Sequence, residues 1–201
     1  MWGGLLVEAT PLHAAPENIN AMSTEPKETD ITAWLNSTER QVLRLGLNKS
    51  ALLRCRLEAS PERVWAACTD RSQLRQWFAD VKGDLHDGAT LAIDVGAPCE
   101  LTSRILQCEP SRRLRFSWSY PGRGIDEVEV RLAANGEGTL LELEHRSDDE
   151  TDWWFGAGSG WEIALIRLTL LLRGDNPSGI ATEKLDQKLG QLWTIAGRAC
   201  A

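Results

Sequence analysis

The stretch of sequence that decides the fold is Trp161-Glu-Ile-Ala-Leu-Ile-Arg-Leu-Thr-Leu-Leu-Leu-Arg173. Trp161, Leu165, Leu168 and Leu172 recur at the spacing of one helical face. Most of the remaining positions are apolar too, so a helix here must be buried along its whole length. The rest of the chain has mainly the patterns of strands, and we therefore expect this helix to pack on the face of a sheet.

Both ends of this helix are marked in the sequence. Ser159 is the expected N-cap, and Glu162 is placed three residues later to complete a capping box. At the other end, Arg173 suits the negative helix terminus and Gly174 can adopt the left-handed conformation. Pro177 then prevents the helix from continuing.

The size and charge of the chain narrow the possible classes of function. A length of 201 residues suits one domain with tails, and 42% hydrophobic and 25% charged residues are ordinary for a globular protein. The net charge of -7 argues against binding to nucleic acid and to anionic membranes. No membrane span is expected, because the longest apolar run, residues 163–172, is interrupted by Arg167 and is shorter than ~20 residues.

The cysteines and histidines do not suggest a metal site or a cofactor. Five cysteines are an odd number, and no two of them form a C-x-x-C pair. A reducing, cytoplasmic location is therefore expected, in keeping with an N-terminus that lacks the basic region of a signal peptide. The three histidines, His13, His86 and His145, are too scattered to predict metal ligands.

The first half of the chain predicts a tail, a docking segment and a strand followed by two short helices. Residues 1–30 are polar and rich in proline, so we expect disorder. Residues 31–49 are expected to form a short helix or an edge segment that docks on the domain. Residues 51–59 alternate as a half-buried strand does, Ser60-Pro61 begins a helix, and Leu74, Trp77 and Phe78 mark a second short helix.

From about residue 81 the apolar period changes to two, which is typical of strands. A break in this alternation at Ile105-Leu106 predicts a β-bulge, and Asn135-Gly136 is a strong hairpin turn signal. Short turns make the strands antiparallel neighbours, with one apolar face and one face of interleaved Arg and Glu. The expected strands cover residues 91–95, 100–109, 114–120, 128–132 and 141–145.

Together these elements predict an α+β fold: a strand, two short helices, and a curved antiparallel sheet of about six strands wrapped around the long C-terminal helix. Residues 176–201 form an expected extension with an amphipathic helix, in which Leu185, Leu189 and Leu192 share one face. That face can cover the side of the long helix turned away from the sheet.

Several spaced motifs in this order resemble the START-like (SRPBCC) helix-grip superfamily. They span residues 50–175, and the branch they resemble is the C-terminal domain of the activator of the heat-shock chaperone ATPase, in its bacterial form. The motifs are Ala59-Ser-Pro-Glu-Arg-Val-Trp65, Leu74-Arg-Gln-Trp-Phe78, Gly83-Asp-Leu85 with Gly88, Arg104-Ile-Leu-Gln-Cys-Glu-Pro-Ser-Arg-Arg-Leu-Arg-Phe-Ser-Trp118, Gly138-Thr-Leu-Leu-Glu-Leu-Glu-His145 and Gly160-Trp161.

The resemblance implies an elongated apolar cavity between the sheet and the long helix. Relatives bind lipids, sterols, polyketides or other hydrophobic molecules, and a few are cyclases or aromatases. The leading hypothesis is non-catalytic binding of a hydrophobic small molecule, such as a lipid, polyketide or aromatic compound. The alternatives are a chaperone-associated interaction domain with a role in the stress response, and a cyclase or aromatase that uses Tyr120 and His145.

The side chains expected to bind the ligand are the aromatic and apolar residues placed near this cavity, with a few polar groups to orient the molecule. A solid core in which the same polar groups bond to the backbone is the alternative. His145 is a weak catalytic candidate, because no nucleophile or carboxylate is tied to it by a motif. The predicted ligand-binding residues are Trp77, Phe78, Phe116, Trp118, Tyr120, His145, Trp161 and Leu165.

The glycine-rich stretch Gly156-Ala-Gly-Ser-Gly160 is expected to be a flexible hinge before the long helix. Its spacing is not that of a nucleotide-binding loop, and it follows an acidic run that would repel phosphate. Residues 153–155, Trp-Trp-Phe, are candidates for an aromatic lip over the cavity, or else pack beneath the loop.

Overall fold

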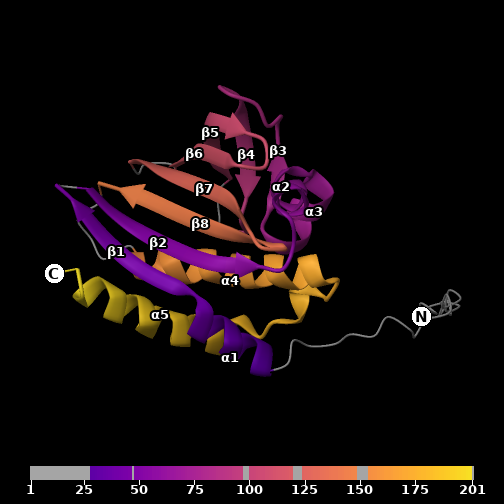
Figure 1. Cartoon of the computed structure of the whole chain (residues 1–201). Coiled ribbons are helices and arrows are strands. Elements are labelled where there is room, and N and C mark those ends of the chain that lie inside the picture. The colour runs from indigo at the N-terminus through magenta and orange to yellow at the C-terminus, as the bar shows by residue number, and fades with distance from the viewer. Residues whose placement is uncertain (1–27, 47, 97–99, 120–123, 149–153, 201) are drawn as a thin grey trace, which may run out of the picture.

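The computed structural model of the chain describes residues 28–46, 48–96, 100–119, 124–148 and 154–200 (Figure 1). Residues 1–27 of the tail that was expected to be disordered lie outside the described residues. The elements, in chain order, are α1 Glu28–Ser37, β1 Glu39–Leu45, β2 Asn48–Leu57, α2 Pro61–Thr69, α3 Arg71–Trp77, β3 Asp80–Lys82, β4 Thr90–Asp94, β5 Leu101–Glu109, β6 Arg113–Ser119, β7 Ile125–Asn135, β8 Gly138–Ser147, α4 Trp154–Arg173, a 3₁₀ turn Pro177–Gly179 and α5 Thr182–Arg198.

The strands form one antiparallel sheet in the order β1-β2-β8-β7-β6-β5-β4-β3. This sheet curves over α4, which confirms the predicted α+β helix-grip fold (Figure 1). Eight strands are present rather than about six, because β1 and the three-residue β3 extend the two edges. The predicted bulge is confirmed, since the register of β5 against β6 shifts between Ile105 and Gln107.

The core lies between the concave face of the sheet and α4. Leu168 of α4 and Leu57 of β2 have no exposed surface. On its other side α4 is covered by α5, whose Leu189 and Trp193 are also fully buried (Figure 1). Burial between a sheet and a second helix explains why α4 is apolar on nearly every side. Within the described residues, no helix is long and apolar enough to cross a membrane.

The start of α4 differs from the prediction. The helix begins at Trp154, seven residues before the expected start, so the glycine-rich stretch is helical and the predicted hinge is wrong. Ser159 is no N-cap: its hydroxyl donates to the Gly156 carbonyl oxygen one turn earlier, at 3.2 Å. Gly158 serves packing instead, because a Cβ atom at this position would overlap the ring of Trp193 on α5.

The capping-box prediction is also wrong for Glu162, which lies inside α4 and not at its start. Its carboxylate is fully buried and joins three flanking elements to α4. It accepts hydrogen bonds from the indole N–H groups of Trp34 on α1 (3.0 Å) and Trp193 on α5 (3.2 Å). Arg40 of β1 completes the site, with Nε 2.8 Å from Oε2 and a second bond to Oε1. We call this the Glu162 cluster.

The end of α4 follows the prediction. Gly174 has a φ of 84°, and its N–H donates to Leu171, while the N–H of Asp175 donates to Leu170. This pair of bonds is a Schellman motif, which satisfies carbonyl groups that the last turn would otherwise leave open.

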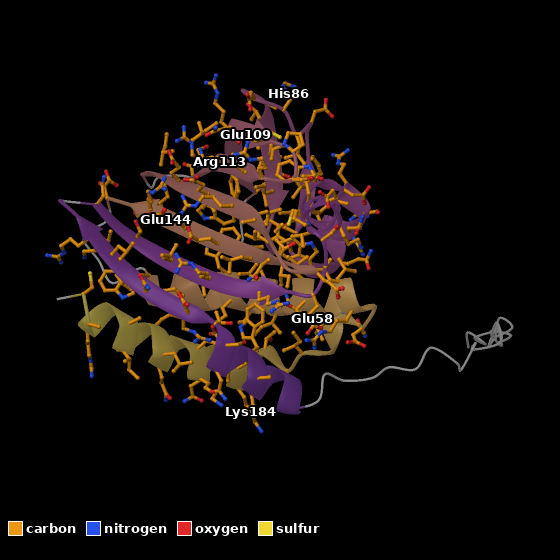
Figure 2. The ribbon with its side chains drawn as sticks, viewed as in Figure 1. Glu58, His86, Glu109, Arg113, Glu144 and Lys184 are labelled. Carbon is orange, nitrogen blue, oxygen red and sulfur yellow. The ribbon has the colours of Figure 1, made fainter. Side chains whose placement is uncertain are left out.

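The convex face of the sheet carries the interleaved charges expected from the sequence (Figure 2). Glu129 shows how they act. Burial alone raises its pKa, but the hydrogen bond from Arg146 and the charges of Arg131 and Arg113 outweigh burial, so the pKa lies below its ordinary value. Glu142 and Glu144 are affected in the same way, with the opposing arginines again outweighing burial. We call these ion pairs the outer-face network.

Candidate ligand-binding cleft

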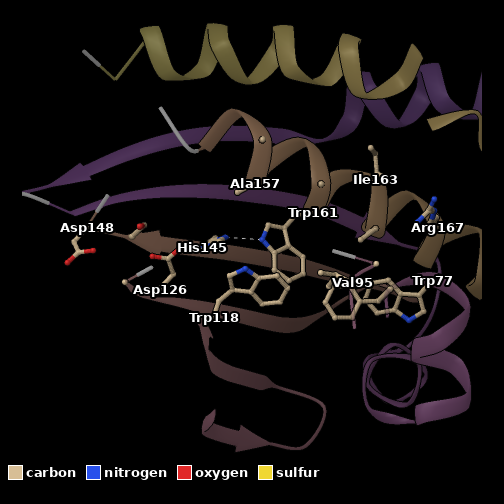
Figure 3. A pocket seen from close by; sticks show the side chains of 17 residues that line it. Trp77, Val95, Trp118, Asp126, His145, Asp148, Ala157, Trp161, Ile163 and Arg167 are labelled. Atoms are coloured by element: carbon tan, nitrogen blue, oxygen red, sulfur yellow. Dashed lines mark hydrogen bonds and ion pairs between the residues drawn. The ribbon is translucent and has the colours of Figure 1, made fainter. Parts of the chain in front are cut away.

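A cleft of about 580 Å³ opens along one side of α4 (Figure 3). One wall is α4 itself, from Gly156 to Arg167, and the facing wall is formed by the ends of β6, β7 and β8. The volume lies within the ~300–1,000 Å³ typical of sites for small molecules.

The floor of the cleft is a group of aromatic rings. Trp161 of α4 stacks on Phe78, with ring centres 5.4 Å apart and an angle of 14° between planes. Trp118 of β6 lies 5.1 Å from Trp161 at a tilt of 58°. Trp77 lies 5.5 Å from Phe78, and its indole N–H is satisfied by the Ala67 carbonyl oxygen at 2.9 Å. These rings offer a broad apolar surface to a ligand.

A second space lies deeper, between α4 and the sheet, and is only about 70 Å³. Trp77, Phe78 and Trp161 line both spaces and so form the wall between them. Phe116 and Leu165 line the inner space alone. The single elongated cavity implied by the family resemblance is therefore divided here, and most of the room lies in the outer cleft.

The predicted residues thus separate into two groups. Trp118 and His145 face the outer cleft, together with the three residues of the shared wall. Tyr120 lies outside the described residues. Of the expected aromatic lip, Trp154 begins α4 and lies under Lys49, whose Nζ is 4.5 Å from the ring centre, and a Cβ atom at Gly197 would overlap its indole.

Both ring nitrogens of His145 are engaged. The indole N–H of Trp161 donates to Nδ1 at 3.1 Å, so Nδ1 is an acceptor and the ring proton lies on Nε2. Nε2 is 3.0 Å from a carboxylate oxygen of Asp126 and donates to it. With Nδ1 directed at an indole and Nε2 carrying a proton, the ring offers no free lone pair to a substrate. This geometry does not favour His145 as a general base.

Charged groups stand at opposite ends of the cleft. Asp126 and Asp148 lie at one end and Arg167 lies at the other, with the aromatic floor between them (Figure 3). Asp126 and Arg167 were not predicted as site residues. The sequence does single out Arg167, because it is a charged residue inside an otherwise apolar run. Nothing in the sequence singles out Asp126, because charged residues are common at the starts of strands.

In the part of the chain that the structure describes, no group of three or more His, Cys, Asp or Glu side chains is placed to hold a metal ion. The four cysteines described there, Cys55, Cys68, Cys108 and Cys200, are free thiols.

Comparisons with known proteins place the chain in a family. The sequence model of the Activator of Hsp90 ATPase homolog 1-like protein family matches residues 58–173. A search of the curated proteins finds no match.

Among solved structures, CalU16 from Micromonospora echinospora is 39% identical, with a TM-score of 0.69, over 79% of this chain and 97% of its own. The part of this chain that aligns with CalU16 is longer than residues 58–173, so the similarity extends to elements that flank the family match. DynU16, described as a protein in the dynemicin biosynthetic locus, is 25% identical, with a TM-score of 0.59, over 64% of this chain and 49% of its own.

The Aha1 dimer from Colwellia psychrerythraea is 20% identical, with a TM-score of 0.55, over 61% of this chain and 95% of its own, and supports the fold alone. The sequence match and the likeness to CalU16 carry the assignment. This chain belongs to the Activator of Hsp90 ATPase homolog 1-like family, with the helix-grip fold of the START-like superfamily.

Proposed function

We propose that the outer cleft binds a hydrophobic small molecule and that the protein acts without catalysis. The observation that carries this proposal is the size of the cleft together with its floor of Phe78, Trp118 and Trp161. A cleft of this volume with an apolar floor and a few polar groups has the character of a ligand site.

The absence of catalysis is proposed from the state of His145. Its two ring nitrogens are directed at Trp161 and Asp126, an arrangement that positions the side chain but leaves it no lone pair for proton abstraction. The relative DynU16 is described as a protein of a biosynthetic locus, and this description supports a role for this protein in binding a small molecule.

The free cysteines support a cytoplasmic location as part of the same proposal. Cys55 is buried as a thiol among apolar neighbours, which suits a reducing compartment.

Two measurements test the proposal. Native mass spectrometry of the purified protein, followed by denaturation and extraction, would show a bound hydrophobic compound. Titration with a neutral fluorescent probe, the primary amide of dansylaminoundecanoic acid, would show saturable binding with a blue-shifted emission.

A cleft-filling variant locates the probe. Gly160 is exposed on α4 and lines the cleft, and a Cβ atom built there meets nothing within 4 Å, so Gly160→Leu adds bulk to the cleft without a backbone clash. We expect this variant to lose probe binding, while Lys188→Leu, on an exposed face of α5, keeps it. Equal binding by the wild type and Gly160→Leu, or no binding by the wild type, would overturn the proposal. The second outcome would direct the search toward a chaperone partner, the class that the family name suggests.

A further inference from the structure

Arg167 is the one charged residue between positions 163 and 172, in the most apolar part of α4. It is partly buried and lines the cleft at the end opposite Asp126 and Asp148 (Figure 3). An arginine in such a run is costly to bury, because its guanidinium stays charged at all ordinary pH values.

The guanidinium of Arg167 is incompletely satisfied. Its Nε atom is buried and has no hydrogen-bond partner among the described residues. Nor does its guanidinium form an ion pair in that part of the chain. The contrast with other arginines is clear: Arg40 binds buried Glu162, and Arg146 binds Glu129 and Glu144. The Nε atom of Arg115 also lacks a hydrogen bond, but a carboxylate oxygen of Glu127 lies 3.7 Å from it.

A guanidinium that has no ion pair among the described residues, at the edge of an apolar cleft, is suited to bind an acidic group of a ligand. Arginine presents parallel N–H groups that match a carboxylate in two bonds, and such charge-assisted bonds are strong where water is partly excluded. The cleft also fixes the direction of an acidic ligand, because Asp126 and Asp148 would repel it at the far end.

The spacing along α4 indicates the length of the ligand. Ala157, on the side of the acidic end in Figure 3, and Arg167 are ten residues apart, which corresponds to about 15 Å along a helix. A long acyl chain or several fused rings would span that length over the aromatic floor.

We propose that the ligand of the cleft is an amphipathic acid whose carboxylate binds Arg167 and whose apolar body lies on Phe78, Trp118 and Trp161. This inference rests on the proposed function and adds the chemical class of the ligand.

The test compares two probes that differ only in charge, dansylaminoundecanoic acid and its primary amide. The wild type is expected to bind the acid ~10- to 100-fold more tightly than the amide, the range given by a charge-assisted hydrogen bond. Arg167→Met should remove this preference by weakening binding of the acid far more than binding of the amide. Arg167→Lys should retain part of the preference, because it keeps the charge but loses the paired N–H groups.

Arg173→Met is the matched control, since it takes the same charge from the same helix at a position outside the cleft. It should keep the full preference for the acid. Amide binding by Arg167→Met also shows that this variant is folded. If the wild type and Arg167→Met bind the acid equally well while both bind the amide, the inference about the acid is overturned and the proposed function stands. If the wild type does not bind the amide, the proposed function is overturned, and the inference that rests on it is overturned too.

Discussion

Replacing Arg40 by methionine should destabilise the protein strongly, because it leaves the carboxylate of Glu162 charged and buried. The side chain of Glu162 is 0% exposed and that of Arg40 is 10% exposed, so water cannot replace the lost partner. Methionine keeps most of the volume and removes only the guanidinium. The variant therefore removes the ion pair with Glu162, together with the two hydrogen bonds that Arg40 donates to the carbonyl oxygens of Leu35 and Thr38.

The expected loss in the free energy of unfolding is about 3 kcal/mol, the lower end of the ~3–5 kcal/mol typical for breaking a buried ion pair. The lower end applies because the indole N–H groups of Trp34 and Trp193 still donate to Glu162. In a chain of this size, the same loss corresponds to a decrease in Tm of roughly 6–12 °C.

Urea denaturation followed by tryptophan fluorescence measures this change. Arg112→Met is the matched control, because Arg112 is exposed and its carboxylate partner Glu109 is 4.0 Å away, so no measurable loss is expected. The double variant Arg40→Met/Glu162→Gln should be more stable than Arg40→Met alone, because it leaves no buried charge. A single variant as stable as the wild type, or a double variant less stable than Arg40→Met, would refute the reasoning.

Three further predictions concern packing, pH and thiol reactivity. Gly158→Ala should lower the free energy of unfolding, measured in urea, by ~1–3 kcal/mol, because the new methyl group meets the ring of Trp193. Gly160→Ala, in open space on the same helix, should raise the free energy of unfolding by up to ~1 kcal/mol. Equal effects of the two variants would contradict the packing argument. The pKa of Glu129 is lower in the folded state than its ordinary ~4.3, so the outer-face network stabilises the fold above that pH. The free energy of unfolding should therefore decline as pH falls from about 5 to about 3. A free energy of unfolding that stays constant over that interval would contradict a stabilising role for the network. Burial, with a smaller contribution from the charge of Glu162, raises the pKa of Cys55 to about 12, so iodoacetamide at pH 8 should label it only after denaturation, as peptide mass spectrometry would show.

Most of the fold could be predicted because its signals are local. The alternation in 114–120 and 141–145 marks strands that lie in the middle of the sheet, and Gly174 marks the end of α4. β3 could not be predicted, because three residues are too few to show a period of two.

The start of α4 was predicted wrongly because the capping-box rule considers only neighbouring residues, whereas distant residues determine the position of Glu162. Ser159 and Glu162 have the spacing of a capping box, but Glu162 is held by Trp34, Arg40 and Trp193, which are between 31 and 128 positions away in the sequence. Gly158 likewise looked like a hinge residue, whereas its role is to admit the ring of Trp193. Neither contact has a local pattern.

The aromatic members of the site were predictable, but their division between two spaces was not. Phe116 and Trp118 are on the same face of β6, and only the packing of Phe78 and Trp161 decides which of them meets the outer cleft. Whether the indole of Trp161 and the carboxylate of Asp126 would both bond to His145 likewise depends on the pairing of three separate elements.

The most direct test of the central claim is a two-dimensional ¹⁵N NMR titration of the tryptophan indole N–H signals with the neutral amide probe, each signal assigned with a Trp→Phe variant. The indoles of Trp118 and Trp161 line the cleft, whereas those of Trp34 and Trp193 are bound to Glu162 and serve as internal controls. Our account predicts saturable shifts of the Trp118 and Trp161 signals and little change in the other two. Unchanged Trp118 and Trp161 signals at saturating probe, or shifts confined to Trp34 and Trp193, would contradict it.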